Sequence, residues 1–214
     1  MRFFVRREPP IGRRGGRRYV LLHGNENTAR EVLDIHMDMY PGTAYLIESA
    51  GRYVTIAGVK IDPNRLFSRV GAEKNIRDQN PGVAQDRLDG ALTFLDRHRE
   101  ELIRRLEPQQ GNLLFALHNN REYSVKEEIG QSDDSSIPEP HRPREFFLCT
   151  DPHDFEVLRH SPYNVVLQNR KPTEDDGSLS RLAAKRGFRY VNLECGIDEI
   201  EAQLERVRWL EEHL

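Results

Sequence analysis

Three His-x-x-Glu pairs occur in the sequence, and such a pair can bind one metal ion when a turn directs both side chains to the same point. The pairs are His23 with Glu26, His98 with Glu101, and His153 with Glu156. The second pair lies in a segment of helical periodicity and the third opens a short helix after a proline, so both are typical of charged helix surfaces. Only His23 and Glu26 follow an apolar strand, which makes them the candidate metal ligands.

A third metal ligand is offered by His118, which ends the apolar segment 112–118. If this strand runs parallel to the strand at 19–22, both histidines lie at the same edge of the sheet. Two imidazoles and one carboxylate suit a catalytic zinc ion, which keeps a position open for water and lowers the pKa of that water to about 7. Taken singly, each histidine is also compatible with an ordinary strand-end residue that bonds to backbone.

Strands and helices alternate along the chain, in the order needed to place these side chains. We expect strands at 19–22, 43–49, 52–61, 112–118, 145–150, 164–169 and 188–194. Val32, Leu33, Ile35 and Met39 recur at helical spacing and predict a first helix, and further helices are expected at about 84–106, 180–186 and 197–214. This alternation predicts an α/β fold with a mostly parallel or mixed sheet covered on both faces. Residues 1–18 are rich in arginine, proline and glycine and are expected to form a mobile arm, which leaves 19–214 as a single domain.

The composition of the chain restricts the classes of partner that it could bind. The 32 basic and 35 acidic residues give a net charge of −3, so no overall field favours nucleic acid or a membrane surface. We find neither an apolar run long enough for a membrane span nor a signal peptide in this sequence, which predicts a cytoplasmic protein. The two cysteines, Cys149 and Cys195, have no metal-binding spacing, and this weakly favours a reducing compartment.

Four motifs, in order, resemble those of the zinc carboxypeptidases and their aspartoacylase-like deacylase relatives. They are "HGNE", "DPNRLF", the strand-end "LHNN" and "DGSLSRLAAKRGFRYVNLE". The resemblance extends from about residue 19 to the C-terminus. The last block is the most specific, because the Gly-Ser pair, the following helix, a glycine, a strand and the glutamate recur without a gap as Gly177-Ser178, Gly187 and Glu194.

The resemblance implies a role for each matching residue. His23, Glu26 and His118 would bind one zinc ion, and Glu194 would act as the general base. A glutamate in that position can take a proton from the attacking water and deliver it to the leaving amine. Asn64 and Arg65 would bind a substrate carboxylate, since a guanidinium group pairs with carboxylate through two hydrogen bonds.

Two positions depart from the family pattern. The family has a further arginine, upstream of the Asn-Arg pair, that polarises the scissile carbonyl; we assign this role to Arg52, with Arg69 as the alternative. The carboxypeptidases also have a tyrosine six residues before the Gly-Ser serine, where this chain has Pro172. Substrate must then be held differently, or Tyr123 or Tyr163 must take the place of that tyrosine.

We therefore expect a three-layer α/β/α sandwich around a mixed sheet, with a zinc-dependent amide-bond hydrolase site at the strand ends. Only one helix is expected after Glu194, so the chain resembles a minimal carboxypeptidase domain more than an N-acyl amino acid deacylase of the succinylglutamate desuccinylase and aspartoacylase type. The expected substrate is a peptide, or in the second case an N-acyl amino acid. A third hypothesis is a non-catalytic binding module that retains the fold. The sequence leaves the oligomeric state open.

Overall fold

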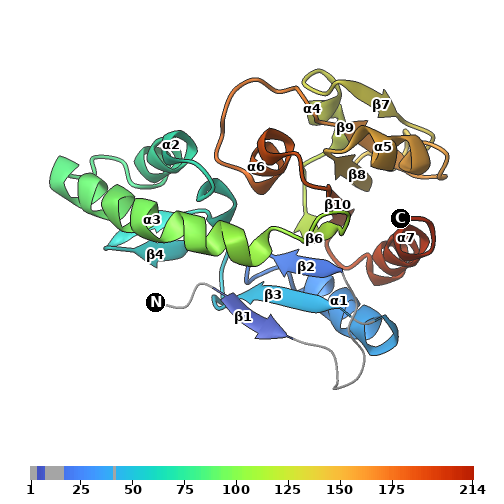
Figure 1. Ribbon diagram of the computed structural model, residues 1–214, viewed down its shortest axis with the longest axis horizontal. Helices are drawn as coiled ribbons and strands as arrows, with labels where there is room; N and C mark the ends of the chain where they lie inside the picture. The colour runs from blue at the N-terminus through green and yellow to red at the C-terminus, as the bar shows by residue number, and fades with distance from the viewer. Residues whose placement is uncertain (1–3, 8–16, 41) are drawn as a thin grey trace.

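The computed structural model describes residues 4–7, 17–40 and 42–214 (Figure 1). Most of the predicted N-terminal arm, residues 1–18, lies outside the described residues. The described residues 4–7 of that arm form a strand at the edge of the sheet. The strands are β1 (Phe4–Arg7), β2 (Arg18–Leu21), β3 (Thr43–Ile47), β4 (Val54–Ile56), β5 (Val59–Ile61), β6 (Leu114–Asn120), β7 (Asp134–Ser136), β8 (Phe146–Cys149), β9 (Asn164–Leu167) and β10 (Tyr190–Gly196). The helices are α1 (Asn27–Met39), α2 (Arg69–Gln79), α3 (Gln85–Leu106), α4 (Val125–Ile129), α5 (Pro152–Leu158), α6 (Leu179–Arg186) and α7 (Ile200–His213), with a 3-10 turn, η1, at Pro63–Arg65.

In the described part of the chain, eight strands form one mixed sheet in the order β1-β3-β2-β6-β10-β8-β9-β7. The four strands β3, β2, β6 and β10 are parallel to one another. Strand β8 runs antiparallel to β10 and parallel to β9, and the two edge strands, β1 and β7, are both antiparallel to their neighbours. The carboxyl ends of β2, β6 and β10 therefore meet at one edge of the sheet.

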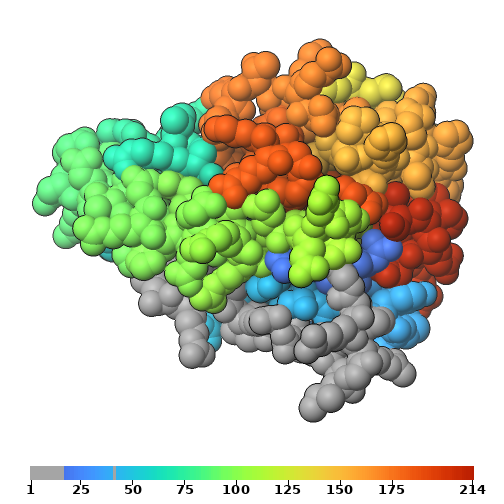
Figure 2. Space-filling model, in the orientation of Figure 1, coloured from blue at the N-terminus to red at the C-terminus, as the bar shows by residue number. Residues whose placement is uncertain are grey.

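Helices cover both faces of the sheet, as the alternation of strands and helices predicts. Successive strand residues point to opposite faces: the face that carries Tyr19 and Leu21 is covered by α1, α5 and α7, and the face that carries Val20 and Leu22 is covered by α4, α6 and the end of α3. Figure 2 shows α6 lying against α3, where Arg186 pairs with the carboxylates of Glu100 and Glu107. The predicted three-layer α/β/α sandwich is confirmed. No helix among the described residues is long and apolar enough to cross a membrane.

The segment 52–61 was predicted to be one strand, and the structure shows two short strands there instead. It forms a hairpin, β4 and β5, which pairs with no other described strand and packs with α2 and the first half of α3 in a separate apolar cluster. Ala57 and Gly58 have φ values of 49° and 80°, and two consecutive residues with positive φ form the tight turn that reverses the chain. This hairpin leads directly into η1, which places the Asn-Arg pair beside the sheet edge.

Candidate active site

His23 and Glu26 lie in the short connection between β2 and α1, and Glu26 is the residue that precedes the first turn of the helix. Gly24 is needed here because of close packing: a Cβ atom at this position would lie 1.7 Å from the carbonyl oxygen of Ser49. The amide of Gly24 also donates to the carbonyl of Gly51, at 3.0 Å. The absence of a side chain at Gly24 lets this connection lie directly on the loop after β3.

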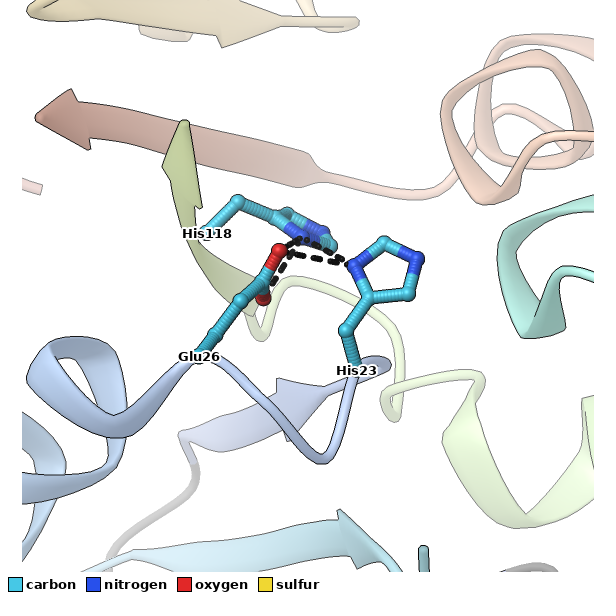
Figure 3. Close-up of side chains that lie close together, drawn as sticks. All are labelled: His23, Glu26 and His118. Atoms are coloured by element: carbon cyan, nitrogen blue, oxygen red, sulfur yellow. Dashed lines mark hydrogen bonds and ion pairs between the residues drawn. The ribbon is translucent and has the colours of Figure 1, made fainter. Parts of the chain in front are cut away.

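His118 brings the third candidate ligand to the same point from β6 (Figure 3). His23 Nδ1 lies 2.8 Å from Glu26 Oε1, His118 Nδ1 lies 3.1 Å from Glu26 Oε2, and the two Nδ1 atoms are 3.2 Å apart. All three residues are buried, with exposed fractions of 2%, 5% and 3% for His23, Glu26 and His118. Because β2 and β6 are parallel, their histidines meet at one edge of the sheet, as predicted.

The three side chains form a group that could hold a metal ion. Tetrahedral zinc has ligand distances of about 2.0–2.2 Å, which places its ligand atoms about 3.3 Å from one another. The observed separations of 2.8–3.2 Å are close to this value. Two imidazoles and a carboxylate are also ligands that zinc accepts in catalytic sites. The residues therefore fit a zinc ion.

Asp62 orients His23 from the other side of the imidazole ring. His23 Nε2 donates to Asp62 Oδ1 at 2.8 Å, and this bond turns Nδ1 toward Glu26 and His118; the lone pair of Nδ1 becomes a ligand once a metal ion replaces the proton there. Asp62 is itself fixed, because the amide of Asn64 donates to it at 2.8 Å and Arg52 Nη2 lies 3.0 Å from its Oδ2. Asp62 was not predicted as a site residue, although it opens the "DPNRLF" motif. A carboxylate directly before a Pro-Asn-Arg turn is the signal that could have identified it.

Burial and the neighbouring opposite charges together determine the pKa values of His23 and Glu26. Burial opposes the charge on His23, but hydrogen bonds to Asp62 and Glu26 outweigh it and raise the pKa of His23 to about 9. Burial likewise opposes ionisation of Glu26, but His118 and His23 lower its pKa to about 2. The negative charge of Glu26 and Asp62 is thus retained in a site with little exposure to water, and such a site attracts a cation.

Glu194 lies on β10, directly beside His118 in the parallel register with β6. Its two carboxylate oxygens accept hydrogen bonds from the amide groups of Asn192 and Asn120, each at 3.1 Å. Burial raises the pKa of Glu194, and the nearby Glu26 carboxylate adds to this shift, whereas His118 opposes it. A raised pKa is what a group that must accept and return a proton near neutral pH needs. The two asparagines were not predicted, although Asn192 precedes Glu194 by two residues on the same strand face.

A cavity of about 640 Å³ connects these groups, and its wall includes all the predicted site residues: His23, Glu26, Arg52, Asn64, Arg65, His118 and Glu194. The carboxamide oxygen of Asn64 accepts from the amide of Leu179, at 3.0 Å, and this contact fixes its orientation. Arg65 Nη1 lies 3.5 Å from Asp176 Oδ2. The structure therefore brings the candidate metal ligands, the candidate base and the candidate carboxylate-binding pair to one cavity.

The Gly-Ser block contributes to the cavity by packing against η1. Gly177 has a φ of 77°, and a Cβ atom there would lie 2.7 Å from the carbonyl oxygen of Arg65. The carbonyl of Gly177 accepts from the amide of Phe67, at 3.1 Å. Ser178 caps the N-terminus of α6 through the amide of Arg181. Only glycine combines this backbone conformation with so close a contact.

The alternative site residues proposed from the sequence lie partly in the cavity wall and partly outside it. Arg69 pairs with Asp96 on α3 and does not line the cavity, in contrast to Arg52. Tyr123 and Pro172 line the cavity, whereas Tyr163 packs against Trp209 in the core on the opposite face of the sheet. The other two His-x-x-Glu pairs lie on α3 and α5, outside the cavity lining.

Comparison with known proteins relates the fold to solved structures. No protein-family profile matches the chain, and no curated protein matches it by sequence. A tripeptide-bound structure of the cell shape determinant Csd4 from Helicobacter pylori aligns with 98% of this chain and 54% of that chain, at a TM-score of 0.52 and 11% identity. The Gln46His variant of Csd4 aligns with the same coverage, at a TM-score of 0.50 and 12% identity. An inferred metallopeptidase from Shewanella baltica has a TM-score of 0.47 and 11% identity over 99% of this chain and 87% of that chain.

The chain therefore spans about half the length of the Csd4 structures that it matches. At this identity the likeness is one of fold, and it agrees with the three-layer architecture described above.

Proposed function

We propose that the chain is a zinc-dependent amide-bond hydrolase of the carboxypeptidase type, which acts on a peptide with a free carboxylate. The observation that carries this proposal is the convergence of His23, Glu26 and His118 at the wall of a cavity that Glu194 also lines. The similarity of the fold to Csd4, which has been solved with a bound tripeptide, supports a peptide as the substrate.

In this proposal each residue has a defined task. When bound, zinc would supply Lewis-acid polarisation of the scissile carbonyl and a lowered pKa for a nearby water molecule. Glu194 accepts a proton from the attacking water and returns it to the leaving amine, a role that its raised pKa supports. Arg52 donates hydrogen bonds to the carbonyl oxygen as negative charge develops there.

Asn64 and Arg65 position the substrate. The amide oxygen of Asn64 is occupied by the Leu179 amide, which leaves its amino group to donate to a substrate carboxylate. Arg65 supplies the guanidinium group: its Nη1 donates to the carbonyl of Asn64 at 2.7 Å and lies 3.5 Å from Asp176, and its other N–H groups would donate to the substrate. A carboxylate bound here would place the terminal amide bond of a peptide toward Glu194.

A test of this proposal combines metal analysis with paired substrates. The purified protein should contain about one zinc per chain. It should hydrolyse a peptide with a free C-terminal carboxylate and leave the same peptide with an amidated C-terminus intact, because the amide removes the anion that Arg65 binds. Arg65→Ala should reduce kcat/KM for the acid by about 10- to 100-fold, as expected for loss of a charge-assisted hydrogen bond.

The matched control for Arg65→Ala is Arg69→Ala, which removes a nearby arginine that pairs with Asp96 outside the cavity. It should leave kcat/KM within about twofold of the wild-type value, as expected for a surface ion pair. Equal cleavage of the acid and the amide would contradict the assignment of Asn64 and Arg65.

Asp62→Asn provides a separate test of the metal site. The substitution keeps the size of the side chain but removes the negative charge that holds the Nε2 proton of His23. Loss of such a supporting carboxylate is expected to weaken zinc binding by about 10- to 100-fold. Competition with a chromogenic chelator measures this affinity. Asp96→Asn, on α3 outside the cavity lining, is the control, and an unchanged zinc affinity in Asp62→Asn would argue against this support.

A further inference from the structure

Arg181 is a half-buried cation in the cavity wall that the proposed reaction does not use. It lies in the first turn of α6, three residues after Ser178, and lines the cavity. Within the described part of the chain, its guanidinium group forms neither a hydrogen bond nor an ion pair, and its Nη1 atom is buried without a partner. Arg52 and Arg65, which line the same cavity, each have a carboxylate partner.

The three carboxylates that act electrostatically on Arg181 already accept hydrogen bonds from backbone amides. Asp175 and Asp176 accept the amides of Gly177 and Ser178, and Asp133 accepts the amides of residues 169–171. Burial lowers the pKa of Arg181, and these three carboxylates oppose the shift only in part. An arginine stays charged even so. A half-buried guanidinium group with no direct counter-ion is costly to fold, unless an anion from outside binds it.

The position of Arg181 relative to Arg65 indicates which part of a substrate it would meet. Asp176 lies 3.5 Å from Arg65 and also stabilises the charge of Arg181, so the two arginines flank the same loop. The amide of Leu179, two residues before Arg181, is the group that orients Asn64. Arg181 therefore lies on the side of the cavity where the terminal residue of the substrate would bind.

We propose that Arg181 is a specificity-determining residue that binds a second carboxylate, on the side chain of the C-terminal residue of the substrate. This inference rests on the proposed function and narrows it to peptides that end in an acidic residue. A planar guanidinium group suits a carboxylate, because two parallel N–H bonds reach both oxygens. A neutral isostere would leave the half-buried Arg181 charge unpaired, and this penalty is the source of the discrimination.

Two peptides that differ only in a C-terminal Glu or Gln test the inference, since both retain the terminal carboxylate. The wild-type protein should cleave the Glu peptide with a kcat/KM about 10- to 100-fold above that of the Gln peptide. Arg181→Met keeps an extended apolar side chain without the charge. It should cleave both peptides at the wild-type Gln rate, and unchanged Gln cleavage also shows that the variant folds.

Lys185→Met is the matched control, because Lys185 lies one turn further along α6, is exposed and does not line the cavity. It should retain the wild-type preference for the Glu peptide. A wild-type protein that cleaves both peptides equally, or a preference for Glu that persists in Arg181→Met, would overturn the inference.

A binding measurement separates this inference from the proposed function. Titration calorimetry of the two peptides against the intact protein reports the preference of the cavity for the second carboxylate, whether or not the peptides are cleaved. Tighter binding of the Glu peptide that is lost in Arg181→Met supports the role of Arg181 even if hydrolysis is absent. Hydrolysis with equal binding of both peptides rejects Arg181 and leaves the peptidase proposal standing.

Discussion

His118→Ala is expected to leave the protein without bound zinc and without hydrolytic activity. Removing this imidazole leaves His23 and Glu26, and two ligands from one short loop cannot hold the ion tightly. His23→Ala should have the same result. Zinc content measured by mass spectrometry after dialysis should fall from about one ion per chain to a background level. Because the three side chains are buried together, local unfolding of the connection between β2 and α1 is expected as well.

His98→Ala is the control for both variants, since His98 belongs to a His-x-x-Glu pair on α3 and its ring packs against Phe94. Zinc content and activity should be unchanged in this variant. Full zinc occupancy in His118→Ala and His23→Ala would remove these residues from the metal site, whereas loss of zinc from His98→Ala would point to general destabilisation.

Glu194→Gln is expected to retain zinc and lose at least about a hundredfold in kcat, the contribution typical of general base catalysis. Glutamine keeps the size and polarity of the side chain but cannot accept a proton at neutral pH. Its carbonyl oxygen can still accept a bond from Asn120 or Asn192, so the fold around β10 should be retained. Steady-state kinetics on the free-acid peptide, together with zinc analysis, provide the measurement.

Asn192→Asp is a useful comparison for Glu194→Gln, because it keeps a polar side chain beside Glu194 but replaces a donor with a second carboxylate. The additional negative charge should raise the pKa of Glu194 further and shift the acid limb of the pH profile upward. Unchanged kcat in Glu194→Gln would exclude Glu194 as the base. Zinc without hydrolysis of any peptide in the wild-type protein would favour a binding module.

The candidate ligands could be predicted because their signals are local. His23, Glu26 and His118 each adjoin a recognisable strand, and parallel strand ends meet at one edge, so the sequence alone implied their proximity. The supporting residues have no such signal. Asp62 meets His23 across 39 residues of sequence, after a hairpin that the sequence suggested was a single strand. Its role depends on a tertiary contact that no periodicity encodes.

The choice between Arg52 and Arg69 also depended on tertiary structure. Arg52 precedes the Asn-Arg pair and Arg69 follows it, and the sequence left the register of the family's arginine uncertain. Only the packing of the loop after β3 against Asp62 places Arg52 in the cavity wall, whereas Arg69 begins α2 and turns to α3. The motif that contains the Gly-Ser pair and Glu194 predicted local structure better: it implied a helix followed by a strand, and the structure has α6 followed by β10.

The contact between η1 and the Gly-Ser loop joins two regions that are more than a hundred residues apart in sequence. The Asn64 side chain bonds to Leu179, Phe67 bonds to Gly177, and a side chain on Gly177 would collide with Arg65. Neither region can change its backbone alone without disturbing the other, so paired substitutions at Asn64 and Gly177 should be strongly non-additive in a double-mutant cycle. For protein engineering, the two regions are one transferable unit: an altered terminal-residue preference would have to be grafted as both segments together.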